Sequence, residues 1–236
     1  MTSSYGDLKE EAWRANMEIP RRGLAIYTFG NVSALDRARA VFAIKPSGVP
    51  YETLTAADMV VLDLECQLVE GKLRPSSDTK THAALYRAFE RPSKEAICGI
   101  AHTHSTYATA WAQAGLPIPI YGTTHADHLA EDVPCTERMT ETAVGGDYEA
   151  ETGKQIVDCF QAREASQTPM VLVAGHGPFT WGKDAEKAVY HAAVLEQLAQ
   201  MAWITRALNP GATRLPDYLV RKHFQRKHGA RAYYGQ

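Results

Sequence analysis

A run of ten residues that ends in two histidines constrains the fold of this chain more than any other stretch. Residues 96–105 read Ala-Ile-Cys-Gly-Ile-Ala-His-Thr-His-Ser, which predicts a buried strand closed by His102 and His104. Side chains two positions apart on a strand share a face, so both imidazoles should project from the same side of the strand end. Residues 170–177, Met-Val-Leu-Val-Ala-Gly-His-Gly, repeat the pattern with a buried strand that ends in His176.

These three histidines have the composition of a metal site. Neutral imidazole is a common metal ligand, and three of them form a frequent zinc-binding set. The plainer interpretation is that they are hydrogen-bonded residues at strand ends, because an isolated His-x-His pair carries little information. The second strand end with a histidine favours the metal, and the glycines that flank His176 would let an ion sit close to the backbone.

Length and charge exclude several classes of protein. A chain of 236 residues is large enough for one domain with a full core, and 25 basic against 27 acidic residues offer no footprint for nucleic acid or a membrane surface. No apolar run reaches the ~20 residues that span a bilayer. The N-terminal segment lacks an apolar signal core and the four cysteines form no Cys-x-x-Cys pair. These features predict a cytoplasmic protein with reduced, mostly buried thiols.

Hydrophobic periodicity predicts alternating helices and strands. Helices are expected over 7–18, 79–89, 106–114, 149–163 and 184–208. Strands are expected over 24–29, 40–45, 59–64, 170–174 and 178–182, besides the strand before His102. Asp7 and Pro20 should bound the first helix, and Ser77 or Asp78 should cap the second. The pattern indicates a single α/β domain with a mixed sheet flanked by helices.

Three short loops have the composition of an anion site. Ser76, Ser77 and Asp78 precede a helix, where hydroxyls and free N–H groups attract anions, although the same residues make a plain N-cap. Gly30-Asn31 and Ser47-Gly48 can present backbone donors to a phosphate, although each alone is usually just a turn.

Two further polar segments are candidates for acid–base chemistry. The cluster Thr123-Thr-His-Ala-Asp-His128 contains Asp127, which could act as a general acid or base, although most loop aspartates only cap or solvate. The basic tail, residues 216–236, ends in Tyr233-Tyr234-Gly-Gln. Terminal residues are usually frayed, but this tail is suited to docking on another subunit.

Ordered motifs along nearly the whole chain resemble the class II aldolase family. They are Thr28-Phe-Gly-Asn-Val-Ser33, Lys45-Pro-Ser-Gly48, Pro75-Ser-Ser-Asp-Thr79, His102-Thr-His-Ser105, Gly122-Thr-Thr-His-Ala-Asp127, His176-Gly-Pro178, Trp181-Gly-Lys183 and Lys227–Gln236. The resemblance implies one class II aldolase-like domain over residues 1–236, with a mostly antiparallel or mixed central sheet. Within the family, Asp78, Asp127 and the terminal Tyr-Tyr-Gly-Gln are most similar to the branch of pentulose-phosphate epimerases.

The resemblance also implies a set of site residues. A divalent metal, most simply zinc with Mn²⁺ or Co²⁺ as substitutes, would be held by His102, His104 and His176, with Asp78 as a further ligand or near-ligand. The implied phosphate pocket consists of Gly30, Asn31, Ser47, Gly48, Ser76 and Ser77. The implied acid–base groups are Asp127 and Tyr234, with Tyr234 reaching in from a neighbouring subunit. Thr123, Glu149 and His223 are implied supporting residues.

The implied activity is epimerisation of L-ribulose 5-phosphate to D-xylulose 5-phosphate at the fourth carbon, in a homotetramer with active sites at subunit interfaces. The alternative is a sugar-phosphate aldolase of the same family, of the fuculose- or rhamnulose-phosphate type, although these carry Glu where this chain has Asp78. A less favoured alternative is a non-catalytic assembly module like the adducin head, which lacks the metal histidines.

Overall fold

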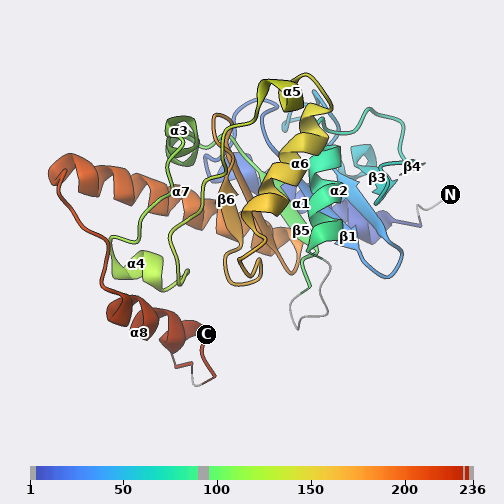
Figure 1. The fold of residues 1–236 in the computed structure, drawn as a ribbon. Coiled ribbons are helices and arrows are strands. Elements are labelled where there is room, and N and C mark those ends of the chain that lie inside the picture. Colours follow the sequence, from blue (N-terminus) through green and yellow to red (C-terminus); the bar gives the residue numbers. More distant parts are fainter. Residues whose placement is uncertain (1–3, 90–95, 231, 234–236) are drawn as a thin grey trace.

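A seven-stranded sheet forms the centre of the computed structural model, which describes residues 4–89, 96–230 and 232–233 (Figure 1). Its strand order is β4-β3-β2-β1-β5-β7-β6, and every pairing of neighbouring strands is antiparallel. The one parallel pairing in the described residues is an isolated bridge between Cys135 and Leu172. The strands are β1 (Asn31–Asp36), β2 (Val41–Ile44), β3 (Val60–Asp63), β4 (Leu68–Glu70), β5 (Gly99–His102), β6 (Met170–Leu172) and β7 (Pro178–Gly182).

Helices surround this sheet, and five of them match the ranges expected from sequence to within a few residues. The helices are α1 (Gly6–Arg21), α2 (Thr79–Ala88), α3 (Thr106–Ala114), α4 (Thr123–Ala126), α5 (Glu141–Val144), α6 (Tyr148–Cys159), α7 (Ala185–Leu208) and α8 (Asp217–His228), with a short 3₁₀ turn, η1 (Ala56–Asp58). The predicted ends of α1 were wrong, because Tyr5 is the N-cap and Pro20 lies within the last turn. Near a helix end a proline sacrifices only one backbone hydrogen bond, so α1 continues past it.

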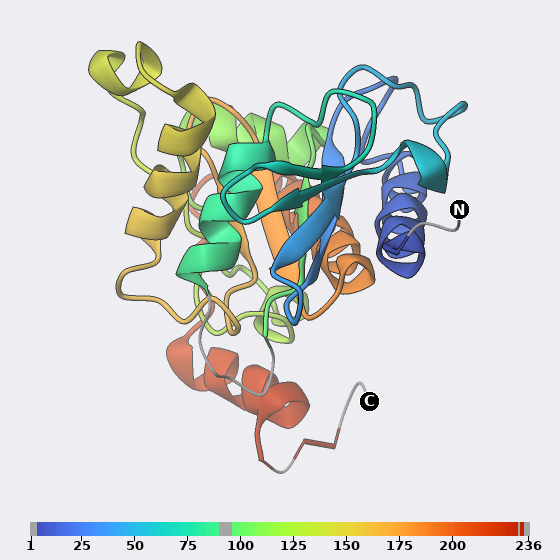
Figure 2. The same ribbon diagram turned by 90° about the vertical axis from the view of Figure 1, so that its right-hand side faces the viewer.

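Helices cover both faces of the sheet, so the core consists of two layers of apolar contacts (Figure 2). On one face, α1 and α7 pack against small and branched side chains that include Val32, Ala43 and Ala101. On the other face, α2 and α6 pack against one another over a cluster with bulkier side chains, which include Phe42, Ile100 and Trp181. Successive side chains on a strand point to opposite faces of the sheet, so alternate residues of the same strands pack into the two layers.

The strand predicted over 24–29 was wrong, and the strand lies a few residues later, at β1. Tyr27 and Gly30 have positive φ angles of 54° and 74°, which break an extended conformation. Leu24 and Ala25 are buried in the core, but Ile26, Tyr27 and Phe29 are exposed, so the apolar side chains of this segment do not line one buried strand face. β1 carries buried Asn31 and Ser33, polar residues that do not suggest a central strand.

The C-terminal region contains a helix that the sequence pattern did not predict. α8 packs on α4, away from the central sheet (Figures 1 and 2), and Val220 is its one buried residue. The four free cysteines are half-buried rather than mostly buried. No helix in the described ranges has the length and apolar character needed to cross a membrane.

Candidate metal centre

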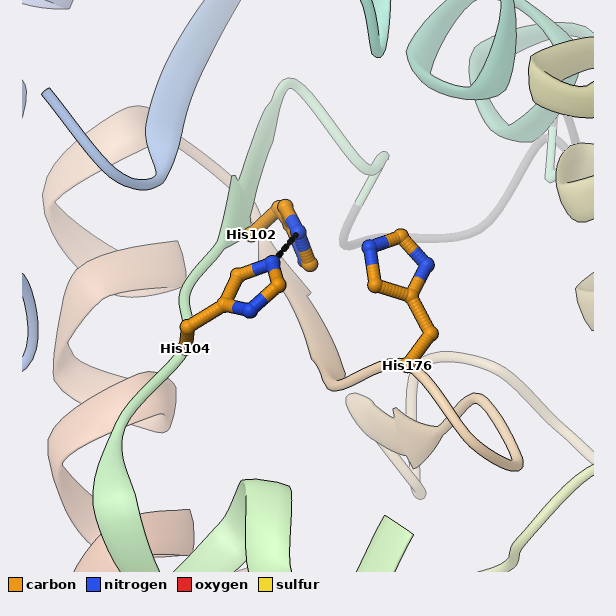
Figure 3. Close-up of side chains that lie close together, drawn as sticks. All are labelled: His102, His104 and His176. Atoms are coloured by element: carbon orange, nitrogen blue, oxygen red, sulfur yellow. Dashed lines mark hydrogen bonds between the residues drawn. The ribbon is translucent and has the colours of Figure 1, made fainter. Parts of the chain in front are cut away.

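His102, His104 and His176 come together at one end of the sheet, with their rings facing one another (Figure 3). One nitrogen from each ring lies within 4.8 Å of the others, and the Nε2 atoms of His102 and His104 are 3.0 Å apart. Nitrogen ligands at about 2.0–2.1 Å from a tetrahedral zinc ion lie about 3.3 Å from one another. Within the described residues this is the one group of three or more potential metal-ligating side chains.

Close backbone packing places the first two histidines. His102 is the last residue of β5 and pairs in register with Asn31, the first residue of β1. Gly30 precedes that strand, and a Cβ atom there would lie 2.8 Å from the carbonyl oxygen of His102. Since this distance is shorter than side-chain contacts allow and φ is positive, glycine is required for β1 to approach β5.

The third histidine lies in the tight turn between β6 and β7. Gly175 has a φ of +77°, and a Cβ atom on Gly177 would lie 3.0 Å from the carbonyl oxygen of Thr103. The sequence interpretation assigned these glycines the role of making space for an ion. They instead allow the turn to reverse and to pack against Thr103, which brings His176 to the other two histidines.

The ring of His102 is fixed from behind. Its Nδ1–H donates a hydrogen bond of 2.9 Å to the carbonyl of Pro178, and the ring stacks on Phe179 with 4.2 Å between centroids. The Nε2 lone pair therefore faces the other two histidines, an arrangement typical of oriented metal ligands. Burial, followed by the neighbouring His102, lowers the pKa of His104, and the same causes lower the pKa of His176 to about 4. Both rings are neutral at physiological pH, as metal ligation requires.

Asp78 adds a carboxylate close to these histidines. It occupies the N-cap position of α2, but its side chain makes no cap and instead accepts a hydrogen bond of 2.6 Å from the Asn31 amide. Burial alone would raise the pKa of Asp78, but the nearby His102 and His82 and the bond from Asn31 hold it below its usual value. Three imidazoles and one carboxylate match the donor set of a divalent cation.

A cavity of about 380 Å³ adjoins the histidines and collects all the residues expected to bind phosphate. These are Gly30, Asn31, Ser47, Gly48, Ser76 and Ser77. The backbone N–H of Ser47 donates to the carbonyl of Arg74, and that of Ser76 donates to the carbonyl of Lys45. These two amides therefore join the loops to each other, whereas we expected them to be free donors for an anion.

Lys45 lines the same cavity and was not among the predicted site residues. Its side chain is 2% exposed, and its ammonium lies 4.8 Å from the centroid of the Tyr51 ring. Burial lowers its pKa to about 8. The signal in the sequence was its position directly before Pro-Ser-Gly. Its burial has meaning only in the structure, because a lysine is rarely buried without an anionic or aromatic partner.

The predicted acid–base residue Asp127 lies outside this cavity in its own chain. Its carboxylate accepts hydrogen bonds of 3.0 and 2.8 Å from Arg226 and one of 3.0 Å from His223, both on α8. Burial would raise the pKa of Asp127, but these two partners keep it below its usual value. His223 therefore supports Asp127 rather than the metal.

The other predicted residues do not line the cavity. Thr123 begins α4, and Glu149 lies in the first turn of α6, where its carbonyl accepts a hydrogen bond from Thr81. Tyr148, which sequence reasoning missed, is closer to the three histidines, because its hydroxyl lies 3.5 Å from Nδ1 of His176. Tyr234 lies outside the described residues.

Comparison with known proteins identifies relatives over nearly the whole chain. Residues 10–203 match the family model of the Class II Aldolase and Adducin N-terminal domain. The chain is 55% identical over 229 residues to a protein of Salmonella paratyphi A named L-ribulose-5-phosphate 4-epimerase UlaF, covering 97% of this chain and 98% of that protein. The protein of the same name from Salmonella paratyphi B is 54% identical over the same shares.

Solved structures share the fold. An L-fuculose 1-phosphate aldolase superposes with a TM-score of 0.76 and 26% identity, covering 96% of this chain and 97% of that one. The L-fuculose 1-phosphate aldolase from Glaciozyma antarctica superposes with a TM-score of 0.73 and 19% identity, covering 95% and 84% of the two chains. The second similarity concerns the fold alone.

Proposed function

The chain belongs to the family of class II aldolases and adducin, and we propose that it acts there as a metal-dependent L-ribulose-5-phosphate 4-epimerase. It would interconvert L-ribulose 5-phosphate and D-xylulose 5-phosphate. The observation that carries this proposal is the set of three histidines and Asp78 beside phosphate-binding loops, in a chain 55% identical to a protein of that name. Because the four cysteines are free thiols, we place the enzyme in the reducing cytoplasm.

The chemistry explains why a metal centre is needed. The hydrogen on the fourth carbon of a ketopentose phosphate is not acidic, so its configuration cannot be inverted by simple proton abstraction. Cleavage of the bond between the third and fourth carbons yields a three-carbon fragment and glycolaldehyde phosphate, and re-addition to the other face of the aldehyde inverts the centre. A divalent ion held by His102, His104, His176 and Asp78 would supply Lewis-acid stabilisation for the negative charge of cleavage. We propose zinc, for which Mn²⁺ or Co²⁺ could substitute.

The phosphate group would keep the aldehyde fragment in place while it rotates. Lys45 is the cation of the cavity, and its buried position strengthens its attraction for a phosphate. The hydroxyls of Ser47, Ser76 and Ser77 add neutral donors in loops already tied together by backbone hydrogen bonds. A fragment anchored in this way can turn about its carbon–carbon bond without being released.

We propose that a second copy of the chain completes the site. Two groups must move protons on opposite faces of the aldehyde, and Asp127 and Tyr234 are the candidates. Asp127 is held on α4 by α8 and does not reach the metal cavity of its own chain. A cyclic homotetramer, with Asp127, Tyr234 and the C-terminal segment 216–236 of one subunit at the metal cavity of the next, satisfies this geometry. Thr123, His223 and Glu149 would then support the shared site.

One alternative is an aldolase that releases its two fragments. The 26%-identical L-fuculose 1-phosphate aldolase gives it structural support. Asp78 disfavours it, because a glutamate reaches far enough to act as a base, whereas the shorter Asp78 is held by Asn31 at the metal centre. A non-catalytic assembly module is disfavoured by the three intact histidines.

Incubation with L-ribulose 5-phosphate distinguishes these functions. We expect D-xylulose 5-phosphate to accumulate without released glycolaldehyde phosphate. Stoichiometric release of glycolaldehyde phosphate would identify an aldolase instead. No turnover by metal-loaded protein would contradict both activities.

A further inference from the structure

Two polar contacts between β1 and α2 lie buried behind the carboxylate of Asp78. Asn31 and Ser33 are two residues apart on β1, so their side chains share one face of the strand. Asp78 and His82 are four residues apart at the start of α2, so they lie on one side of the helix. The first contact is the hydrogen bond of 2.6 Å from Asn31 to Asp78. In the second contact, the Ser33 hydroxyl lies 2.7 Å from Nδ1 of His82.

Each contact leaves one buried polar atom without a hydrogen-bond partner among the described residues. These atoms are Oδ1 of Asn31 and Nε2 of His82. Native proteins rarely leave buried polar atoms unpaired, because the lost hydrogen bonds to water are not replaced. Two such atoms on neighbouring contacts point to one shared partner. An amide oxygen only accepts hydrogen bonds, so the two atoms complement each other if Nε2 of His82 carries a hydrogen.

A chain of hydroxyl groups determines which ring nitrogen of His82 carries the hydrogen. The hydroxyl of Tyr86 lies 2.7 Å from that of Ser33 and 3.5 Å from the carbonyl of Cys98. Burial raises the pKa of Tyr86, so the phenol keeps its proton and donates it to the nearer acceptor, Ser33. The Ser33 hydroxyl then donates to Nδ1 of His82. Burial lowers the pKa of His82 to about 3, so the ring is neutral and its one hydrogen lies on Nε2.

The spacing of the two contacts suits a water molecule. A strand rises about 3.3 Å per residue and a helix about 1.5 Å, so the contacts are about 6 Å apart along both elements. A direct hydrogen bond is too short to join them, whereas one water joins two partners up to roughly 5.5 Å apart. Buried waters usually make about three hydrogen bonds, and the carboxylate of Asp78 is a third polar group beside the other two.

We propose that His82 is a positioning residue for Asp78 and that it acts through one buried water. The water would accept a hydrogen bond from Nε2 of His82 and donate to Oδ1 of Asn31 and to the carboxylate of Asp78. With donors from both the Asn31 amide and the water, the carboxylate is held in one orientation beside the three histidines. This inference rests on the proposed function, because it assumes that a metal binds at this centre.

Zinc affinity, measured by competition with a chromophoric chelator, tests the role of His82. The amide of His82→Gln reaches the position of Nε2 and can donate there, whereas the amide of His82→Asn reaches only the position of Nδ1, next to Ser33. We expect His82→Gln to bind zinc within about 3-fold of wild type and His82→Asn to bind it about 10-fold more weakly. A histidine that only supports packing predicts the reverse order, because His82→Asn keeps the contact with Ser33.

His125→Gln is the matched control. His125 is another buried histidine whose Nε2 has no partner in the described part of the chain, but it lies on α4 and does not line the metal cavity. This variant should bind zinc as wild type does. Wild-type protein that binds no zinc would contradict the proposed function together with this role of His82. The reverse order of the two His82 variants would contradict only the role of His82.

Solid-state ¹⁵N NMR of histidine-labelled, zinc-loaded protein tests the tautomer, with the His82 signals identified by their loss in His82→Gln. We expect a protonated Nε2 and an unprotonated Nδ1. Tyr86→Phe, which removes only the hydroxyl at the start of the chain, covers His82 variants that fail to fold, and it should shift one histidine to a mixture of tautomers. An unprotonated Nε2, or an unchanged spectrum in Tyr86→Phe, would overturn the proposal.

A crystal structure of the zinc-loaded protein tests the water itself. It should show a water within hydrogen-bond distance of Nε2 of His82 and of Oδ1 of Asn31. An empty gap between these two atoms would overturn the bridge.

Discussion

The side-chain amide of Asn31 donates a hydrogen bond of 2.6 Å to the carboxylate of Asp78, which joins the first residue of β1 to the N-terminus of α2. One carboxylate oxygen is thereby used, and the orientation of the group is set before any metal binds. Asn31 also pairs in register with His102. Asn31 therefore links Asp78 to β5, the strand that ends at His102.

This link makes Asp78→Asn a test of the role of the carboxylate. We expect the variant to bind metal about 10- to 100-fold more weakly. This is the usual effect of replacing a residue that orients the metal ligands. Asn31→Ala should weaken metal binding by less, because it leaves the charge in place. Competition with a chromophoric chelator measures both. Unchanged metal affinity combined with weaker substrate binding would assign Asp78 to the phosphate site.

Metal removal should abolish turnover, and added zinc should restore it. His104→Asn should strongly reduce bound metal, because the centre loses one of its three imidazoles. His191→Asn is the matched control, since His191 is a half-buried histidine that hydrogen-bonds to the carbonyl of Trp181 away from the centre, and it should retain metal. Elemental analysis of the dialysed proteins gives the metal content. Full activity in metal-free protein would contradict the assignment.

The lowered pKa of Lys45 predicts a pH dependence of substrate capture. Lys45 is cationic below a pKa of about 8 and loses its charge as pH rises through that value. Because kcat/KM reports the free enzyme, it should fall above about pH 8 while kcat changes less. Lys45→Met should raise KM about 10-fold or more and remove this basic limb. An unchanged profile in Lys45→Met would assign the limb to another group.

The ion pairs of Asp127 predict a pH-dependent stability of the C-terminal helix. The folded-state pKa of Asp127 lies below its unfolded value, so its contribution is complete above the unfolded value and is lost as pH falls through the folded one. Asp127→Asn should therefore lower the melting temperature at pH 7, and this effect should shrink as the pH falls below the unfolded pKa and through the folded one. The expected loss is about 2 kcal/mol, typical of charged hydrogen bonds.

Arg226→Met should have the same effect, and the double variant should be little worse than either single variant, because the partners share one interaction. Thermal denaturation followed by circular dichroism measures all three proteins. Additive losses would show that the two residues act independently.

The grouping of the three histidines was predictable from sequence because they lie at the ends of regular elements. His102 and His104 follow from the period of a buried strand, and β5 ends at His102 as expected. β1 was misplaced because its polar residues are satisfied by distant partners. Ser33, for example, lies 2.7 Å from both His82 and Tyr86 of α2.

The surroundings of Asp127 were not predictable for a related reason. α8 is too polar for its periodicity to show a helix, and only its contact with α4 reveals which face is buried. The partners of Asp127 are about 100 residues away in the chain, so no local pattern contains them. Local propensity fixes elements, whereas polar contacts between them depend on the complete fold.

The proposal that Asp127 acts on the metal cavity of a neighbouring subunit can be tested with hybrids. His104→Asn and Asp127→Asn should each lower turnover about 10²-fold or more, the usual effect of losing a catalytic group. If Asp127 acts between subunits, unfolding and reassembling the two inactive variants together places an intact metal cavity next to an intact Asp127. In a cyclic assembly with random mixing, about a quarter of the sites regain both groups.

Tyr234→Phe mixed with His104→Asn should recover in the same way if the tyrosine is also supplied by the neighbour. Each variant reassembled alone is the control and should stay inactive. Because both variants of a pair alter different sides of one shared site, recovery cannot arise within a single chain. Mixed assemblies verified by native mass spectrometry that show no recovery would place Asp127 and the metal in the same subunit's site, against the shared site that we propose.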